Sequence, residues 1–386
     1  MFEKLSSFHT ANLIISGIGA ANELGGIVKK FSSGKVLIIT DKGVVAANLL
    51  NKIENNLENH DIEYGIFDKV EHDPSIESIK ECLDFSNKKS YDLIILIGGG
   101  SSIDVGKIVA MLKECGGSIK DYFGLDKVPR RGLPTIAIPT TAGTGSEVTP
   151  VAVISDKQEQ KKIGIQSPFI IPDVAIVDPL MTLTCPPKVT AATGMDAFTH
   201  AIEAYLSINN SSITDMFALE AIRLISSSIR SAVAKGENVE ARTGMCQGSL
   251  YAGIAFANAG TAAVHAIAMT IGGVYDIPHG VANAMLLPYV MKYNALSNLN
   301  KMANIAAAMQ ENILSLSPRE AAMKAIEAVK QLSIDVKVMH TLREFGATKE
   351  EIPGLAQKAI MVTRLLRNNP RNASIEDLEE ILRQAY

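Results

Sequence analysis

Asp196 and His200 are the residues of this sequence whose types and spacing first point to chemistry. They lie within a helical pattern, residues 186–205, whose interior positions are otherwise Ala, Met and Ile. Side chains four residues apart on a helix lie one turn apart on the same face, so a carboxylate and an imidazole point together into an apolar interior. Buried polar groups need partners. The two side chains either hydrogen-bond each other or are two ligands of one metal ion.

Two further histidines lie later in the chain. His265 is on an apolar helical segment, and His279 follows a proline just before a predicted helix over 281–291. Each of them alone is better explained as a hydrogen-bonded structural histidine. Together with the first pair they form a possible set of one carboxylate and three imidazoles, which suits a divalent first-row metal and leaves room for a substrate oxygen.

The first half of the chain contains two candidate phosphate-binding loops. Residues 98–102, Gly-Gly-Gly-Ser-Ser, follow a strand-like run over 92–97 and lead into a helical run. Glycines let the backbone approach a phosphate, and the free N–H groups at a helix start favour an anion. A tight turn that needs glycine for steric reasons is the alternative. Residues 139–147 also follow a strand and carry four hydroxyl groups, so the pair of loops predicts a dinucleotide site.

Asp41 bears on the identity of that dinucleotide. It follows a strand that ends at Thr40, where an acid accepts hydrogen bonds from an adenosine ribose and repels a 2′-phosphate. This favours NAD over NADP, and a solvated loop acid is the alternative. The pattern is not a Rossmann fingerprint, because Gly17-Ile18-Gly19 has the wrong spacing and is expected to precede, not follow, a clear strand.

The elements that must position these residues change in type along the chain. Short β-branched runs alternate with helical patterns in the first half, which predicts a largely parallel sheet covered by helices. The predicted strands are 35–40, 92–97, 135–139, 151–154 and 174–178, and the predicted helices include 43–59 and 76–88. From residue 188 the pattern is helical, with interruptions expected near 209–210, 235–236, 272–273, 278 and 288. We therefore expect an α/β domain over 1–186 and an all-helical domain over 187–386.

Composition and charge narrow the class of partner. A chain of 386 residues is long enough for two cores, and its net charge of −4 provides no basic field for nucleic acid or an anionic membrane. The four cysteines are scattered without CxxC spacing, which fits a reducing cytoplasm. The N-terminus lacks signal-peptide features, and the apolar stretch 251–275 carries Asn258 and His265, so it is interpreted as buried helix. A small-molecule partner is expected.

Taken together, these motifs resemble the iron-containing (group III) alcohol dehydrogenases over essentially the whole chain. The resemblance rests on Gly98-Gly99-Gly100-Ser101-x-x-Asp104, on residues 140–147, on 191–203, and on 258–260 through 278–280. It implies a dehydroquinate synthase-like fold with an α/β dinucleotide-binding domain and a helical metal-binding domain. It also implies one metal, usually Fe²⁺ and alternatively Zn²⁺, held by Asp196, His200, His265 and His279.

The resemblance further implies the contacts of the cofactor and the substrate. Cofactor contacts are expected from Asp41, Gly98, Gly99, Gly100, Ser101, Asp104, Thr140, Thr141, Thr144, Ser146, Val151 and Lys162. Phe256 matches a position near the nicotinamide and substrate, and with Met269 it is expected to line the substrate pocket. Val151 and Phe169 add to the apolar character of that pocket.

Two residues depart from the family pattern. Met269 stands where many relatives have the second histidine of a His-x-x-x-His motif that begins at His265, which removes one proton shuttle. Our hypothesis is that the proton instead leaves through water or the nicotinamide ribose hydroxyl. Asp73-Pro74 replaces a frequent Asn-Pro, a change that concerns an adenosine contact.

The expected function is hydride transfer between NAD(H) and a short-chain primary alcohol, diol or aldehyde, with the metal as Lewis acid. Reduction of a lactaldehyde-, 4-hydroxybutyrate- or sulfoacetaldehyde-type substrate is the alternative. A non-redox dehydroquinate synthase-like lyase, a metal-free maleylacetate reductase-like enzyme and a metal-binding scaffold are the remaining alternatives. The set of metal ligands argues against the metal-free enzyme. The two phosphate loops argue against the scaffold. A cytoplasmic homodimer or larger homo-oligomer is expected.

Overall fold

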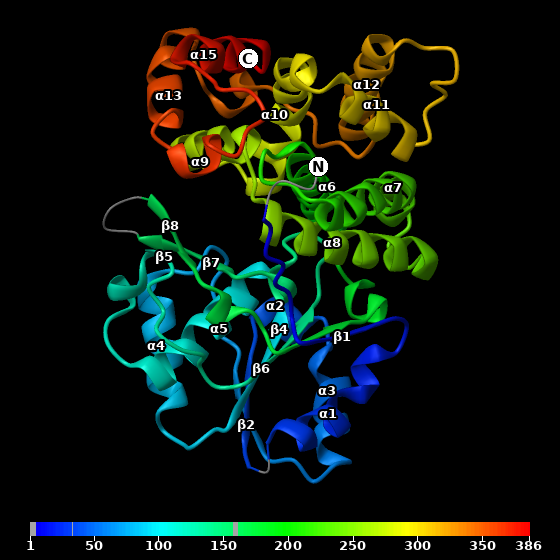
Figure 1. Cartoon of the computed structure of the whole chain (residues 1–386). Helices are drawn as coiled ribbons and strands as arrows, with labels where there is room; N and C mark the ends of the chain where they lie inside the picture. The colour runs from blue at the N-terminus through cyan, green and yellow to red at the C-terminus, as the bar shows by residue number, and fades with distance from the viewer. Residues whose placement is uncertain (1–4, 33, 157–160) are drawn as a thin grey trace. The chain divides into compact units, whose positions relative to one another are not determined.

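The computed structural model describes residues 5–32, 34–156 and 161–386, which form two compact units (Figure 1). One unit is His9–Cys185, and the other is Pro186–Tyr386 together with residues 5–8. The predicted domains differ from these units in assigning the residues before His9 to the first domain. That residue 186 separates two domains remains a prediction.

A six-stranded parallel sheet forms the centre of the unit His9–Cys185. Its order is β1-β9-β6-β4-β2-β3, and all neighbouring strands are parallel. The strands are β1 (Leu13–Ser16), β2 (Val36–Ile39), β3 (Tyr64–Phe67), β4 (Leu93–Gly98), β6 (Thr135–Pro139) and β9 (Val174–Val177). The parallel sheet agrees with the prediction from alternating β and helical patterns.

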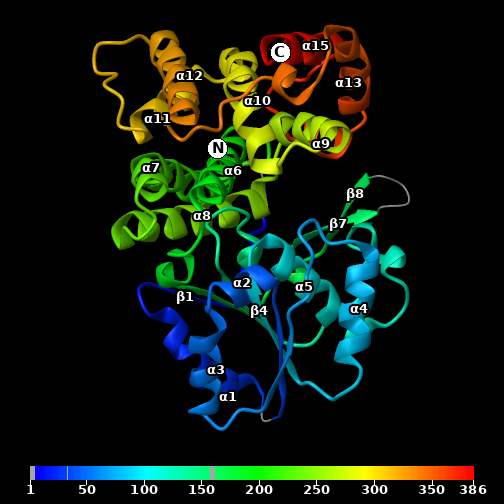
Figure 2. The ribbon, with the colours of Figure 1, turned by 180° about the vertical axis from the view of Figure 1, so that it is seen from behind.

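Two helical layers bury the two faces of this sheet (Figure 2). In β4, Leu93, Ile95 and Ile97 belong to one apolar cluster, and Ile94 and Leu96 belong to the other. The first cluster includes residues of α1 (Leu24–Phe31) and α3 (Leu50–Glu58), and the second includes residues of α4 (Ile76–Ser86) and α5 (Gly100–Cys115). Burial on both faces explains why the central strands are continuous apolar runs.

The strand order contains a switch point between β2 and β4. The chain runs from β2 outward to β3 and then returns to the other side of β2 to form β4. In open α/β sheets, ligands bind at the carboxyl ends of the strands next to such a point. Val36 pairs with Leu93, so Asp41 after β2 and Gly99 after β4 follow strands that end at the same edge.

Strand β3 was not predicted, and three further features of this unit differ from the prediction. A strand, β1, does precede Gly17, so the expectation that no clear strand comes before that glycine was wrong; the strand is short and half exposed. The single helix expected over 43–59 is split into α2 (Lys42–Ala46) and α3, with Asn48 in a left-handed conformation between them. A second sheet, β5 (Gly124–Leu125), β8 (Lys161–Gln166) and β7 (Val151–Asp156), was not predicted as such.

The unit Pro186–Tyr386 is helical. Its helices are α6 (Pro187–Leu206), α7 (Ser212–Ala234), α8 (Val239–Ala259), α9 (Ala263–Tyr275), α10 (His279–Asn294), α11 (Leu299–Ala308), α12 (Pro318–Asp335), α13 (Ile352–Ala359), α14 (Thr363–Leu366) and α15 (Ile375–Gln384). Three of these helices begin with a capping box, which Ser211 forms at α7, Ser317 at α12 and Ser374 at α15.

Two expected interruptions of the helical pattern are wrong. Gly272 and Gly273 lie inside α9, and Pro288 lies inside α10. A proline removes one helical hydrogen bond, and a glycine costs about 1 kcal/mol relative to alanine. Helix α10 is largely buried, so its packing outweighs the penalty of Pro288.

The segment around Asn368 and Asn369 ties distant parts of this unit together. Asn369 and Asn294 exchange two side-chain hydrogen bonds of 2.8 Å, so the end of α10 is held by a residue that follows α14. Asn368 accepts a hydrogen bond from the amide of Ile208 and donates one to the carbonyl oxygen of Thr261. These contacts connect the loops that follow α6 and α8.

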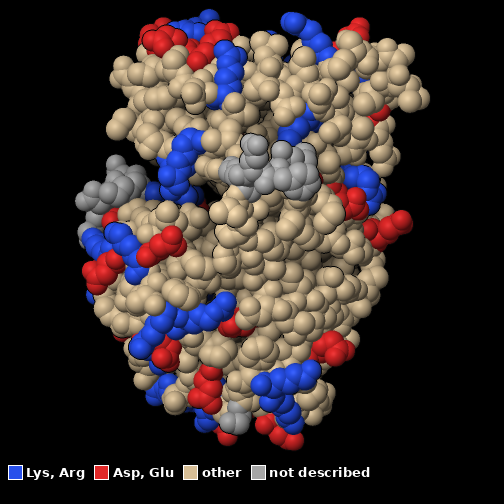
Figure 3. All heavy atoms as spheres, in the orientation of Figure 1, with Lys and Arg blue, Asp and Glu red and all other residues tan. Residues whose placement is uncertain are grey.

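On the face drawn in Figure 3, Lys and Arg are interspersed with Asp and Glu. Among the described residues, no single helix has the length and apolar character to cross a bilayer; α8 and α9 meet those criteria only as a pair, and the pair is bent by 101°.

Candidate functional site

Helices α6, α9 and α10 bring the four predicted metal ligands together. Asp196 and His200 lie one turn apart in the middle of α6 and are 4% and 6% exposed. His265 is the third residue of α9 and is buried, and His279 is the first residue of α10, with its side chain 40% exposed. The cluster is therefore open on the side of His279.

The three imidazoles converge on one carboxylate oxygen. Oδ1 of Asp196 lies 3.9 Å from Nε2 of His200 and 3.7 Å from Nε2 of both His265 and His279. The ligand atoms of Asp196, His265 and His279 all lie within 4.8 Å of one another. The His200 ring stacks on the His265 ring at 4.6 Å, and the His265 and His279 rings meet edge to face at 5.3 Å.

This donor set fits a divalent first-row metal ion. In a tetrahedron with metal–ligand bonds of about 2.1 Å, the ligand atoms are about 3.4 Å apart, slightly less than the separations between Asp196 and the three rings. Burial by itself raises the pKa of Asp196, but the imidazoles of His200, His279 and His265 outweigh it and hold that pKa below its ordinary value. The residues therefore present an ionised carboxylate to a cation.

His265 shows how protons compete with a metal for this cluster. Its burial lowers the pKa of the ring, but the carboxylates of Glu203 and Asp196 together raise it to about 9. A metal ligand must be deprotonated, so metal binding to the metal-free protein releases protons.

Two residues of this cluster were missed from the sequence. Glu203 on α6 contacts Nδ1 of His265 at 2.6 Å. Asn283 on α10 is fully buried, and its Nδ2 lies 2.6 Å from Oδ1 of Asp196 and 3.2 Å from Nε2 of both His265 and His279. Helical spacing was the available signal, because Glu203 follows Asp196 by seven residues and Asn283 follows His279 by four.

Gly280 allows α10 to start against α6. A Cβ at this position would lie 2.1 Å from the carbonyl oxygen of Ala192, one turn before Asp196. Only glycine permits this backbone contact, which sets the position of the neighbouring His279.

The first predicted phosphate loop has the expected strand–loop–helix geometry. Helix α5 begins at Gly100, directly after β4, and Gly98 has a φ of 147° that favours glycine. Ser102 donates a hydrogen bond of 2.8 Å to Oδ2 of Asp41, whose Oδ1 accepts one from the amide of Val44 at the start of α2. Asp41 and the glycine loop are thus held side by side at the switch point.

The second loop lies against the first. A Cβ at Gly100 would meet Thr144 at 2.6 Å, a Cβ at Gly99 would lie 3.5 Å from Thr141, and the amide of Thr140 donates to the carbonyl oxygen of Gly98. Six of the predicted cofactor contacts are therefore neighbours: Gly98, Gly99, Gly100, Thr140, Thr141 and Thr144. Ser101 is part-buried in the first turn of α5.

A buried lysine that was not predicted holds the second loop. Lys107 on α5 is 1% exposed, and its Nζ donates to Oγ of Ser146 at 2.7 Å and to the carbonyl oxygens of Thr149 and Val151 at 3.0 Å. Burial lowers the pKa of Lys107 to about 8, although Asp104 and Glu147 raise it. A lysine in the apolar run that follows Asp104 was the signal for this role.

Asp104 and Ser146 are engaged within the protein. Oδ1 of Asp104 accepts a hydrogen bond of 2.5 Å from Ser146, and Oδ2 accepts one from the amide of Val153. Glu147 is 2% exposed, and its burial raises its pKa to about 7. The direct cofactor contacts of Asp104 and Ser146 stay predictions.

The remaining predicted residues have different settings. Lys162 forms an ion pair of 2.8 Å with Asp73, the residue that departs from the family's asparagine. Phe256 stacks on the ring of His200 at 4.2 Å, so it adjoins the metal cluster. Met269 is part-buried on α9, one turn after His265. Val151 begins β7 and Phe169 is 39% exposed, and both belong to the unit His9–Cys185.

Comparisons with known proteins match one family over the sheet-containing part and over the helical part of the chain. Residues 11–179 match the family described as "Iron-containing alcohol dehydrogenase", and residues 190–386 match "Fe-containing alcohol dehydrogenase family, C-terminal". Long-chain-alcohol dehydrogenase 1 of Geobacillus thermodenitrificans is 40% identical over 373 residues, covering 96% of this chain and 94% of the relative.

Solved structures give the same result. A 1,3-propanediol oxidoreductase superposes with a TM-score of 0.96 at 39% identity, covering 99% of this chain and 100% of the other. The sulfoacetaldehyde reductase of Bifidobacterium kashiwanohense in complex with NAD⁺ superposes with a TM-score of 0.90 at 30% identity, covering 99% of each chain. The chain therefore belongs to the iron-containing alcohol dehydrogenase family and is an oxidoreductase of the alcohol dehydrogenase or aldehyde reductase type.

Proposed function

We propose that this protein transfers a hydride between NAD(H) and a short-chain primary alcohol, diol or aldehyde. The observation that carries the proposal is the convergence of three imidazole Nε2 atoms on one buried oxygen of Asp196, at 3.7 to 3.9 Å. A divalent iron bound there supplies Lewis-acid polarisation of the substrate oxygen, and a nicotinamide supplies or accepts the hydride.

The chain's own residues hold and orient these groups. Asp196, His200, His265 and His279 are the proposed ligands, and the stacking of Phe256 on His200 keeps that ring in place. The open side of His279 gives a substrate access to the cluster. Met269 has a thioether where a proton shuttle would need a titratable group, so we propose that the substrate proton leaves through water or the ribose of the cofactor.

The dinucleotide is proposed to bind at the β2/β4 switch point. The start of α5 and the two adjacent loops supply amide donors for the phosphates, and Asp41 supplies the carboxylate that favours NAD over NADP. The NAD⁺ complex of a relative supports the same choice. We propose Lys162 as a further contact, made at the expense of its ion pair with Asp73.

We further propose a cytoplasmic homo-oligomer. All four cysteines are free, as expected in a reducing compartment. Size-exclusion chromatography with light scattering tests the oligomeric state.

The test is a panel of small alcohols and aldehydes assayed with NAD(H) and NADP(H) after anaerobic reconstitution with Fe²⁺ or Zn²⁺. Asp196→Ala and His200→Ala are expected to lose both bound metal and turnover while retaining NADH binding. His340→Ala, which removes an imidazole paired with Glu344 elsewhere in the helical unit, is the matched control. An Asp196→Ala protein that is active and contains stoichiometric metal contradicts the proposal.

A further inference from the structure

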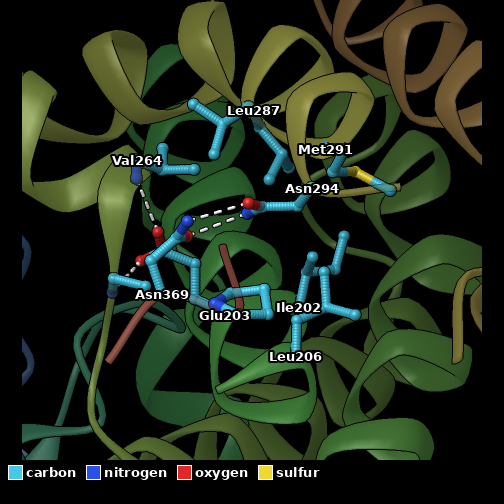
Figure 4. A pocket seen from close by; sticks show the side chains of 11 residues that line it. Ile202, Glu203, Leu206, Val264, Leu287, Met291, Asn294 and Asn369 are labelled. Atoms are coloured by element: carbon cyan, nitrogen blue, oxygen red, sulfur yellow. Dashed lines mark hydrogen bonds between the residues drawn. The ribbon is translucent and has the colours of Figure 1, made fainter. Parts of the chain in front are cut away.

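Glu203 is a buried carboxylate outside the proposed ligand set. It lies on α6 and is 4% exposed. Its Oε1 accepts a hydrogen bond of 2.6 Å from the amide of Val264, drawn in Figure 4, and its Oε2 accepts one of 2.9 Å from the amide of Ala262. These amides lie at the start of α9, where N–H groups have no partner inside the helix. Glu203 therefore caps α9 from another helix.

The same carboxylate contacts a proposed metal ligand. Oε2 of Glu203 lies 2.6 Å from Nδ1 of His265. Each oxygen of Glu203 already accepts a hydrogen bond from a backbone amide, and a carboxylate that accepts through both oxygens presents an acceptor to the ring as well. The hydrogen therefore resides on Nδ1, and in the neutral ring the lone pair is on Nε2.

Nε2 is the nitrogen of His265 that faces the other proposed ligands, 3.7 Å from Oδ1 of Asp196. A hydrogen on Nε2 would occupy the side of the ring from which a metal is bound. We propose that Glu203 is a positioning residue, which holds His265 in the Nδ1–H form and in the orientation that directs its Nε2 lone pair into the cluster. This inference rests on the proposed function, because it takes His265 to be a ligand.

Glu203 is surrounded mainly by apolar side chains. It borders a cavity of about 10 Å³ whose lining is mostly apolar and includes Ile202, Leu206, Val264 and Leu287 (Figure 4). The two asparagines that line the same cavity, Asn294 and Asn369, are hydrogen-bonded to each other. A cavity needs about 10–15 Å³ and several polar partners to hold a water molecule. Loss of the carboxylate therefore leaves the donors at the start of α9 without partners.

Glu203→Gln keeps the side-chain volume but replaces one of the two acceptor oxygens by an NH₂ group. The variant therefore tests whether both acceptors are needed. If the new amide oxygen faces Val264, the NH₂ group faces Nδ1 of His265 and moves the hydrogen of the neutral ring to Nε2. If the oxygen faces His265, the NH₂ group faces the N–H of Val264. Two donors then oppose each other, and the start of α9 loses a hydrogen bond. Since removal of an outer hydrogen-bond partner typically weakens metal binding about 10- to 100-fold, we expect a loss in that range.

The experiment uses the full-length protein, stripped of metal and titrated with Zn²⁺ against a chelator. In parallel, ¹⁵N NMR of histidine-labelled, metal-free protein identifies the tautomer of His265 at a pH where the ring is neutral. Asn298→Ala is the control, because Asn298 caps α11 in the same unit by accepting from the amide of Lys301. The control is expected to lower thermal stability and leave Zn²⁺ affinity within twofold of wild type.

Weaker Zn²⁺ binding by Glu203→Gln together with an Nδ1–H ring in the wild type supports the inference. Zn²⁺ affinity of Glu203→Gln within twofold of wild type overturns it. If that variant does not fold, the wild-type spectrum decides, because a neutral His265 with its hydrogen on Nε2 also overturns the inference. Wild-type protein that does not bind Zn²⁺ overturns the proposed ligand set, and this inference with it.

Discussion

Gly280→Ala is expected to damage the metal site more than it damages the rest of the helical unit. Gly280 is the second residue of α10, next to His279, and an added Cβ would lie 2.1 Å from the carbonyl oxygen and 2.6 Å from the carbonyl carbon of Ala192. Both atoms belong to the backbone of α6, so no side-chain rotation relieves the contact.

The size of the displacement follows from that contact. Real Cβ atoms essentially never approach closer than 3.0 Å, so the start of α10 must move by at least about 0.9 Å, the difference between 3.0 and 2.1 Å. Metal–ligand distances are tolerant to only about 0.2 Å. His279 therefore leaves bonding distance, and we expect metal binding at least about 10-fold weaker. Overpacking is expected to lower the free energy of unfolding by about 1–3 kcal/mol.

Anaerobic titration of the metal-free variant with Fe²⁺ or Zn²⁺ against a chelator measures the first effect, and urea unfolding without metal measures the second. Gly273→Ala is the matched control, because it makes the same change in ligand-bearing α9, where an added Cβ has no atom within 4 Å. Equal metal affinities of the two variants would refute the reasoning.

Three further predictions concern the unit His9–Cys185. Glu147→Gln should flatten the dependence of stability on pH. The pKa of Glu147 is about 7 in the native state and 4.5 in the unfolded state, so the native state binds more protons between these pH values. The contribution of protonated Glu147 to the free energy of unfolding is therefore lost as the pH rises through 7. The variant should gain up to about 3 kcal/mol relative to wild type between pH 5 and 8 in urea unfolding, and parallel profiles would contradict this. Lys107→Met should weaken NADH binding in fluorescence titrations without changing metal content, whereas Lys113→Met, at the end of α5, should not weaken it; equal NADH affinities would show that Lys107 does not hold the loop. Asp41→Ser should lower the preference for NADH over NADPH by about 10-fold or more, measured as the ratio of kcat/KM values, because it removes the repulsion of a 2′-phosphate; an unchanged ratio would remove Asp41 from cofactor choice.

Part of the metal cluster was readable from helical spacing. Asp196 and His200 share a face of α6 because they are four residues apart, and that was visible in the sequence. His265 and His279 were candidate ligands by residue type, but the choice of a metal site over structural histidines depended on the resemblance to a family, since no local pattern connects α6 with helices that begin more than sixty residues later. Glu203 was missed because its partner is 62 residues away, and a carboxylate near a helix end otherwise reads as a surface group.

The strands show a similar division. Strands β4 and β6 were predicted to within one or two residues, because burial on both faces makes them continuous apolar runs. Strand β1 was missed, since its four residues are only partly buried and its pairing with β9 joins segments about 160 residues apart. Pro288 was taken for a helix break because local propensity does not reveal how deeply α10 is packed.

The amide pair between Asn294 and Asn369 has a consequence for biosynthesis. The four proposed ligands lie between residues 196 and 279, whereas the residues that tie α10 and the ends of α6 and α8 together are 368 and 369, about 90 residues later. At about 5–20 residues per second, the ribosome needs roughly 5–18 s to synthesise that interval. We therefore expect all four proposed metal ligands of a nascent chain to be synthesised before the residues that hold their helices together. Iron that is taken up during translation should exchange faster than iron that is bound by the finished protein.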